Sequence, residues 1–309
     1  VWFGFDEASC QPCDPGKYCL EDDRLIECEA GFICSWGATK PDPNDGITGF
    51  ICPKGHYCTA GALRPEPCPA GFYMEDEGAG SEDDCFECEP GFYCPRASES
   101  GTQHACLEGY YCPQGSAVGN AEACPVGHAC PAGSSEPEPC AQGTYAPIIK
   151  MASCLDCPEG FYCPDEANID PIICPAGAFC EAKVDEIKLC AAGTFNSYEG
   201  ARSQADCTTC PGGYYCLDGT AAIDESIRCL AGYYCPPGTM AQTENMCEVD
   251  YYCPTGASAM QPCDVGFYSI SPLASDCKPC EAGYYCPRTK TDKAGNPNTL
   301  TQREPCEEG

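Results

Sequence analysis

One short motif recurs along the chain and constrains its fold more than any other feature. Twelve segments share a seven-residue pattern: Cys, any two residues, a turn residue, any one residue, a residue that is usually aromatic, and Cys. Examples are CDPGKYC at 13–19 and CPEGFYC at 157–163. The turn residue is Gly in eleven copies and Asp250 in the other. Self-similarity of this kind predicts a tandem array in which each copy packs on its neighbours in sequence.

Each position of the motif has a mechanical interpretation. Gly in the fourth place predicts a tight turn with a positive φ, which Asp250 also tolerates better than most residues. The aromatic residue before the second Cys is expected to lie against a disulfide, with sulfur near the ring. Pro often follows the second Cys and ends the extended segment.

The cysteine content determines how such an array is stabilised. The 309 residues include 34 Cys, 30 Pro and 33 Gly. Cross-links must therefore replace much of the apolar burial of an ordinary domain, and thiols at this density are oxidised only outside the cell or in the secretory lumen. We expect an extracellular or cell-surface protein with a small disulfide-rich, mostly irregular fold of short β-hairpins, arranged as an elongated tandem-repeat rod.

Charge and hydropathy exclude several classes of partner. Acidic residues number 47 and basic residues 16, so the formal net charge is −31. A field of that sign repels nucleic acid and anionic lipid. The sequence has no apolar run long enough to span a bilayer, so no membrane span is expected in this segment. Because the motif that begins at Cys306 is cut at Gly309, we expect a longer polypeptide.

Four further segments open with Cys, two residues, Gly and an aromatic-containing pair, and end on a Cys-x-x-Cys. We interpret each as a small hairpin closed by its own end cysteines. Closing a loop of this size is worth about 3 kcal/mol in the chain-entropy picture. The expected disulfides are Cys68–Cys85, Cys140–Cys154, Cys190–Cys207 and Cys263–Cys277.

A longer period is superimposed on the motif. The cysteine pattern from Cys68 onward returns at Cys190, and that from Cys140 returns at Cys263, so the unit is a pair of modules of about 123 residues. The expected modules are a partial one at 1–67, then 68–139, 140–189, 190–262 and a second partial one at 263–309.

The remaining cysteine pairing stays open. With the four hairpins closed internally, Cys10 and one cysteine near the C-terminal end are left without partners. Within the other groups we consider a staggered pattern, first to third and second to fourth, for the set Cys157, Cys163, Cys174 and Cys180.

The Cys-x-x-Gly-Thr/Phe-Tyr opening, the closing Cys-x-x-Cys-Pro-x-Gly-x-Tyr-Cys and their serial repetition resemble the cysteine-rich repeats of the ephrin-receptor-like class. Those repeats are similar to tumour-necrosis-factor-receptor and EGF-like modules and occur in long arrays in large surface proteins of single-celled eukaryotes. The resemblance covers Cys10 to Gly309 and implies a module type, whereas receptors, coats and filaments all use such modules.

Catalytic and metal chemistry have little support in the sequence. The five Cys-x-x-Cys pairs would suit zinc or a redox dithiol, but their regular recurrence, the oxidising compartment and the presence of only three His favour structural disulfides. No nucleophile elbow or phosphate loop is present, so we expect no enzyme and no cofactor. Calcium is the one candidate ion, at Asp42 and Asp45 or at Asp83 and Asp84; the alternative is a solvated acidic loop. Any glycan would be O-linked, because no Asn-x-Ser/Thr sequon occurs.

Apolar residues at the tips of two equivalent hairpins are candidates for lateral association. They are Ile148, Ile149 and Met151 in one and Ile270 and Leu273 in the other. We therefore expect a structural component of an extracellular filament, flagellar hair or coat, with copies of itself or other filament or matrix proteins as partners. The alternatives are that the tips fold against their own module, or that the chain is the ligand-binding ectodomain of a receptor or adhesin.

Overall fold

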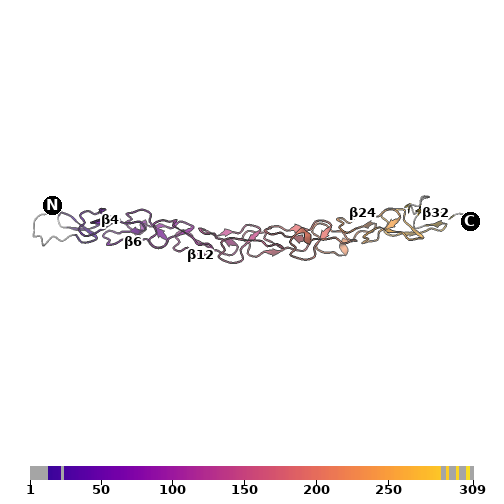
Figure 1. Ribbon diagram of the computed structural model, residues 1–309, viewed down its shortest axis with the longest axis horizontal. Coiled ribbons are helices and arrows are strands. Elements are labelled where there is room, and N and C mark those ends of the chain that lie inside the picture. Colours follow the sequence, from indigo (N-terminus) through magenta and orange to yellow (C-terminus); the bar gives the residue numbers. More distant parts are fainter. Residues whose placement is uncertain (1–12, 22–23, 287–289, 292–296, 299–303, 307–309) are drawn as a thin grey trace. The chain divides into compact units, whose positions relative to one another are not determined.

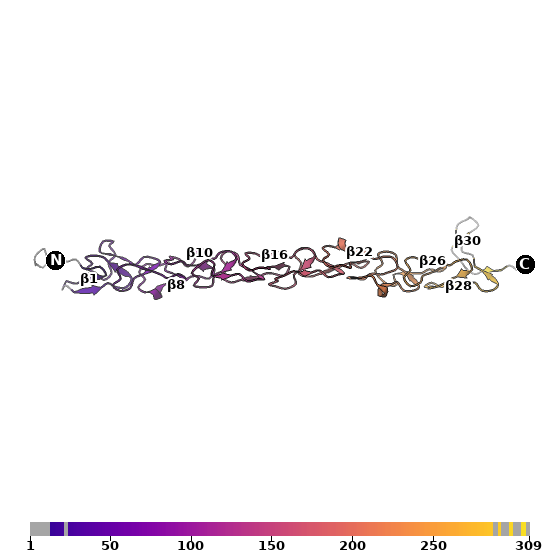
Figure 2. The same cartoon turned by 90° about the horizontal axis from the view of Figure 1, so that it is seen from below.

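The computed structural model describes residues 13–21, 24–286, 290–291, 297–298 and 304–306. Contacts divide the chain into two compact units: Val1–Ala141, Tyr145–Leu155 and Glu166–Ile169 form the first, and Gln142–Thr144, Asp156–Asp165 and Asp170–Gly309 form the second. In both units, short arrows separated by loops follow one another in sequence order, such as β4, β6 and β12 in the first unit (Figure 1). The second view shows the same order for β22, β26 and β28 of the second unit (Figure 2).

The strands are two or three residues long and pair as antiparallel hairpins. In the first unit they are β1 (Lys17–Cys19), β2 (Leu25–Glu27), β3 (Phe32–Cys34), β4 (Gly49–Ile51), β5 (His56–Tyr57), β6 (Glu66–Pro67), β7 (Phe72–Tyr73), β8 (Phe86–Glu87), β9 (Phe92–Tyr93), β10 (His104–Ala105), β11 (Tyr110–Tyr111), β12 (Glu122–Ala123), β13 (His128–Ala129) and β14 (Glu138–Pro139). β15 (Thr144–Tyr145) and β16 (Leu155–Asp156) contain residues of both units.

The second unit continues the same series. Its strands are β17 (Phe161–Tyr162), β18 (Ile172–Ile173), β19 (Ala178–Phe179), β20 (Lys188–Leu189), β21 (Thr194–Phe195), β22 (Thr208–Thr209), β23 (Tyr233–Tyr234), β24 (Asn245–Met246), β25 (Tyr251–Tyr252), β26 (Gln261–Pro262), β27 (Phe267–Tyr268), β28 (Lys278–Pro279), β29 (Tyr284–Tyr285), β30 (Lys290–Thr291), β31 (Pro297–Asn298) and β32 (Glu304–Pro305). Helical structure in the described part of the chain is limited to three 3-10 turns, η1 (Glu82–Asp84), η2 (Gln204–Asp206) and η3 (Glu225–Ile227). The predicted class, a tandem repeat of short disulfide-linked hairpins, is confirmed.

Each repeat is a turn followed by a two-stranded hairpin. The motif Gly has the positive φ expected of it, as at Gly16 with φ 81° and Gly160 with φ 82°. Asp250 also takes this conformation, with φ 76°. The strand after the turn pairs with the strand just before the next motif, as Phe161 does with Ile173, and the N–H of Cys174 donates to the Gly160 carbonyl.

A regular set of backbone hydrogen bonds joins each repeat to the next. In the first unit the Gly91 N–H donates to the carbonyl of Cys112, which ends the next motif. The Cys94 N–H donates to the Ser116 carbonyl, and the Gly115 N–H donates back to the Cys88 carbonyl. Three bonds thus connect consecutive repeats in addition to the one that closes each hairpin.

The second unit has the same connections. The Gly177 N–H donates to the Asn196 carbonyl, the Cys180 N–H to the Ala201 carbonyl, and the Gly200 N–H to the Cys174 carbonyl. Because buried backbone groups require partners, this pattern satisfies the main chain without long strands. A repeat therefore depends on its sequence neighbours for its hydrogen bonds, as in solenoid proteins.

Sixteen disulfides link the residues that the structure describes. Twelve join the two cysteines of one motif, six residues apart, and four close the longer hairpins at Cys68–Cys85, Cys140–Cys154, Cys190–Cys207 and Cys263–Cys277. The staggered pattern is wrong: Cys157 pairs with Cys163 and Cys174 with Cys180, because the tight turn brings the ends of each motif together.

Two cysteines were expected to lack partners within the chain. Cys306 is exposed and forms no disulfide among the described residues. Cys10 lies outside the described residues. In the Cys-x-x-Cys pairs that the structure describes, the two cysteines do not bond each other. Cys85, for example, bonds Cys68 before it, and Cys88 bonds Cys94 after it.

The four longer hairpins are copies of the same repeat. The residue in the place of the second motif Cys is Met74, Ala146, Asn196 or Ser269. These residues accept the backbone bond from the preceding turn just as a second Cys does, for example from the N–H of Gly55 to the Met74 carbonyl. Only the disulfide differs, because the first Cys instead bonds a cysteine three residues before the next motif.

The core consists largely of cystine sulfur and tyrosine rings. Most disulfide cysteines are fully buried, and Tyr162 packs against Cys174, Ala178 and Cys180. Tyr18 and Tyr234 contact the corresponding cystines one repeat further on. The expected contact between ring and disulfide is confirmed, and it connects neighbouring repeats.

Local structure follows the period of about 123 residues. The turns η1 and η2 occupy equivalent places, and each is capped by a serine at its start and an aspartate at its third residue. In η1 the Asp84 carboxylate accepts from the N–H groups of Gly80 and Ser81, and in η2 Asp206 accepts from those of Arg202 and Ser203. The hairpins closed by Cys68–Cys85 and Cys190–Cys207 therefore share a capped turn that recurs with this period.

Candidate interaction surfaces

The hairpin closed by Cys140–Cys154 presents aliphatic side chains to solvent. Ile148 is 63% exposed and Ile149 55%, whereas Met151 is half-buried. Lys150 has φ 65°, and its ammonium lies 5.1 Å from the centre of the Tyr110 ring, a cation–π contact. The N–H of Lys150 also donates to the Cys124 carbonyl, so the tip is fixed to the preceding repeats.

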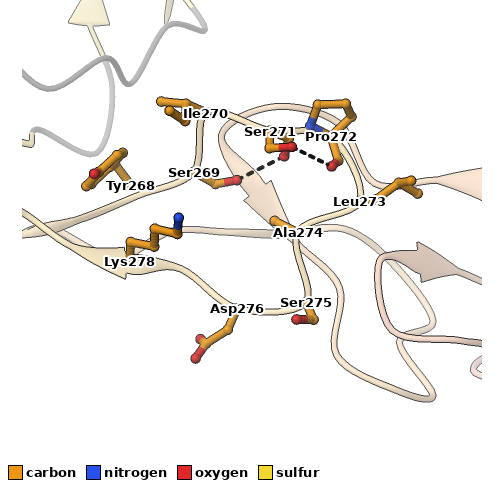
Figure 3. A pocket seen from close by; sticks show the side chains of 10 residues that line it. All are labelled: Tyr268, Ser269, Ile270, Ser271, Pro272, Leu273, Ala274, Ser275, Asp276 and Lys278. Carbon is orange, nitrogen blue, oxygen red and sulfur yellow. Dashed lines mark hydrogen bonds between the residues drawn. The ribbon is translucent and has the colours of Figure 1, made fainter.

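The equivalent hairpin of the second unit surrounds a small hollow of about 230 Å³. Ile270 is 60% exposed and Leu273 41%. Figure 3 shows these two side chains at different points of the loop, with Asp276 and Lys278 on the returning segment. The Ser269 hydroxyl donates to the Ser271 carbonyl, and that of Ser271 to the Pro272 carbonyl. The full lining is Tyr268, Ser269, Ile270, Ser271, Pro272, Leu273, Ala274, Ser275, Asp276 and Lys278.

The acidic loop at 42–48 uses its carboxylate to hold its own backbone. Asp45 Oδ1 accepts from the N–H groups of Ile47 and Thr48 at 2.8 and 2.7 Å, and Oδ2 accepts from the Thr48 hydroxyl at 2.8 Å. These bonds, first that from the Ile47 N–H, lower the pKa of Asp45 to about 2. Asp42 is exposed in the same loop.

The second acidic loop does the same with Asp84, which caps η1, while Asp83 is exposed beside it. In the described part of the chain, no three His, Cys, Asp or Glu side chains gather in an arrangement that would hold a metal ion. Calcium at Asp42, Asp45, Asp83 or Asp84 stays a prediction from the sequence.

We expect the turn at Asp45 to survive to unusually low pH. Its folded pKa lies below the ordinary value of 3.8, so its stabilising contribution is complete above about 3.8 and is lost as the pH falls through about 2. Amide shifts of Ile47 and Thr48 in an NMR titration should therefore stay constant down to about pH 3. In Asp45→Asn the acid transition at these amides should be absent. An Asp45 pKa near 4 would contradict the assignment.

The insert at 35–51 differs from the regular repeats. Trp36 is 62% exposed and Ile47 81%, and both lie in the connection between β3 and β4. Large apolar side chains exposed on one irregular segment are typical of a contact surface.

Sequence reasoning missed a row of residues that directly precede the first Cys of a motif. Several of them extend over a positive-φ glycine two repeats further along the chain: Ile173 lies near Gly200, and Leu189 near Gly219. Both aliphatic side chains remain more than 40% exposed. The signal in the sequence was the position itself, one residue before Cys, which is occupied by Ala, Arg, Asp, Glu, Ile, Leu, Met, Pro or Thr.

No protein-family model and no curated protein matches the chain. In the residues that the structure describes, no helix is long and apolar enough to cross a membrane. The disulfide-linked tandem repeats identify a cysteine-rich array of the extracellular or secreted kind, which serves as a structural protein or an ectodomain.

Proposed function

We propose that the chain is a structural component of an extracellular filament, flagellar hair or surface coat, in which the repeats form a stiff rod. The observation that carries the proposal is the backbone connection between consecutive repeats, such as Gly91 to Cys112 and Gly177 to Asn196. An array of independent modules joined by flexible linkers would lack such bonds and would bend freely between the modules. We propose no catalytic activity for the chain. Its resemblance to ephrin-receptor-like repeats supports the type of module.

Electron microscopy of the native, unreduced protein tests the rod. We expect uniform rods whose contour is straight over many repeats, and ordered polymers as the concentration rises. A calcium chelator is added in a parallel sample to test the acidic loops. Flexible strings of beads or compact particles would overturn the proposal, whereas straight rods that shorten or bend only after reduction would support it.

A second function is favoured by the insert at 35–51, whose exposed Trp36 and Ile47 stand outside the periodic pattern. This segment would suit capture of a ligand by a receptor or adhesin ectodomain. Binding of the labelled chain to intact cells should then fall in a Trp36→Ala, Ile47→Asp variant. Equal binding by the variant and the unaltered chain would contradict the capture function and leave the structural one.

A further inference from the structure

We propose that the chain extends and recovers under tension, as a molecular spring whose travel is limited by its disulfides. The inference rests on the proposed structural function and deepens it, because it adds a mechanical property that a stiff rod alone does not have. It depends on two features of each repeat. Its covalent cross-link stays within the repeat, and only non-covalent contacts hold it to the other repeats.

The disulfides are arranged in series along the chain. Each one closes before the next begins, as Cys88–Cys94 does before Cys106–Cys112, and none of those that the structure describes joins two repeats. Tension between the two ends therefore passes across each disulfide and bypasses the residues inside its loop. The bypassed loops hold about half of the residues from Cys13 to Cys286, so the disulfides set the length at which extension stops.

The segments between consecutive disulfides are the parts of the described chain that tension can straighten. The segment from Cys94 to Cys106 is typical. Its 12 residues span about 40 Å when fully extended. The Cys-x-x-Cys segments at 85–88 and 207–210 are too short to release much length. Each long hairpin therefore moves together with the motif that follows it.

Backbone hydrogen bonds and packing hold each of these segments closed. The segment from Cys94 to Cys106 is closed by the pairing of β9 with β10 and by the bond from the Cys106 N–H to the Gly91 carbonyl. Hydrogen bonds of this kind contribute little individually, because water replaces them when they break, whereas the S–S bond is covalent. The hairpin therefore opens under a tension that leaves every disulfide intact.

We expect the hairpins to open one after another. Consecutive repeats share three backbone bonds, and close contacts reach a little further, as from Gly177 to Gly219 two repeats along the chain. An array held by such local contacts opens in parts rather than as one cooperative domain. Each opened hairpin adds one segment to the stretched length, so extension consists of a series of short steps.

The closed loops also prepare the chain to recover when the tension falls. A motif keeps its turn while its hairpin is open, because the disulfide still joins its two ends; in Cys88–Cys94 the Cα atoms are 5.8 Å apart. Refolding then requires the closure of a loop of about ten residues, which takes about 10–100 ns in a free chain. The entropy cost of closing so short a loop is small, and we expect recovery without the slow steps of a large β-domain.

Single-molecule force spectroscopy on the full, oxidised chain, held by tags at its two ends, tests the spring. We expect successive steps, most of about 30–40 Å, and the same steps again after the tension is released. The variant Cys190→Ala, Cys207→Ala should lengthen the stretched chain by about 50 Å, because it frees 17 residues whose ends were 5.8 Å apart. The matched control Cys210→Ala, Cys216→Ala frees a separation of 6 residues and should add about 15 Å.

A glycine variant measures the force of a step separately from its length, and it replaces the cysteine variants if they fail to fold. In Gly177→Ala the clash with Gly219 weakens one connection, so a step should occur at lower force while the final length stays the same. Gly133→Ala is the matched control, because a Cβ at Gly133 meets nothing within 4 Å. Its steps should change less.

The outcomes separate the spring from the rod. One large release of a whole unit, or extension that is not recovered when the tension falls, would overturn the spring and leave the rod intact. Equal lengthening by the two cysteine variants, or equal step forces in the two glycine variants, would also overturn it. Flexible strings in electron microscopy, where no force acts, would remove the rod function and this inference with it.

Discussion

Replacing Gly177 with alanine should open the connection between two repeats and destabilise the second unit locally by several kcal/mol. Gly177 has φ 81°, a conformation that costs an L-residue about 1–2 kcal/mol. In addition, a Cβ built there would lie 2.3 Å from the carbonyl oxygen of Gly219 and 3.0 Å from its carbon. Because those atoms are backbone, no side-chain rotation relieves the clash, and the two repeats must separate.

Hydrogen exchange is the suitable measurement, since an array of this kind does not unfold in a single two-state step. Protection should fall at the amides that connect the repeats, including the Gly177 N–H and the Gly219 N–H, and should be unchanged in the first unit. Gly133→Ala is the matched control: Gly133 has φ 85°, yet a Cβ there would meet nothing within 4 Å. In that variant the loss of stability should come only from placing an L-residue at a positive φ. Equal effects at the two sites would mean that the close approach of Gly177 to Gly219, two repeats further along the chain, has no energetic weight.

Replacing Cys190 and Cys207 together with alanine should cost about 3 kcal/mol of local stability. This disulfide closes a loop of 17 residues, and its sulfurs pack with Phe179 and Ala201. The chain-entropy estimate for a six-residue loop is nearer 2 kcal/mol, so the double variant Cys210→Ala, Cys216→Ala should be less affected. Both pairs are otherwise comparable because all four cysteines are buried.

Denaturant-dependent hydrogen exchange of the repeats around each disulfide gives the comparison. Protection lost around Cys190 should exceed that lost around Cys210, and distant repeats should keep theirs because each repeat contacts repeats close to it in the sequence. An unfolding of the whole second unit in either variant would contradict the local character of the repeats. A larger loss for the shorter loop would show that packing of the sulfurs outweighs loop entropy.

The sequence predicted the parts of the fold that depend on single residues. A Gly four positions into a recurring motif needed a positive φ, and Asp250 took its place by the same conformation. The four long hairpins closed as their end cysteines suggested. The pairing of Cys157 with Cys163 was not foreseen, because spacing alone does not reveal that the turn brings Cα atoms six residues apart to within 6.1 Å.

The relation between the hairpins was equally hidden. Met74 and Asn196 do not look like cysteine replacements in the sequence, and only the shared backbone bonds reveal that they occupy the same position. For the candidate surfaces, the sequence located Ile148, Ile149, Ile270 and Leu273, and the structure shows these side chains exposed. Their role in association stays a prediction. The hollow beside Ile270 depends on how one loop folds back, which no residue pattern encodes.

The short reach of the disulfides also determines how such a chain matures during secretion. No cysteine of a described disulfide has its partner more than 17 residues away. Synthesis adds about 5–20 residues per second. The two thiols of each cross-link therefore enter the oxidising lumen within seconds of each other. We expect oxidation to follow the order of translation, after which each closed motif presents two N–H donors and one carbonyl to the next repeat, as Gly91, Cys94 and Cys88 do.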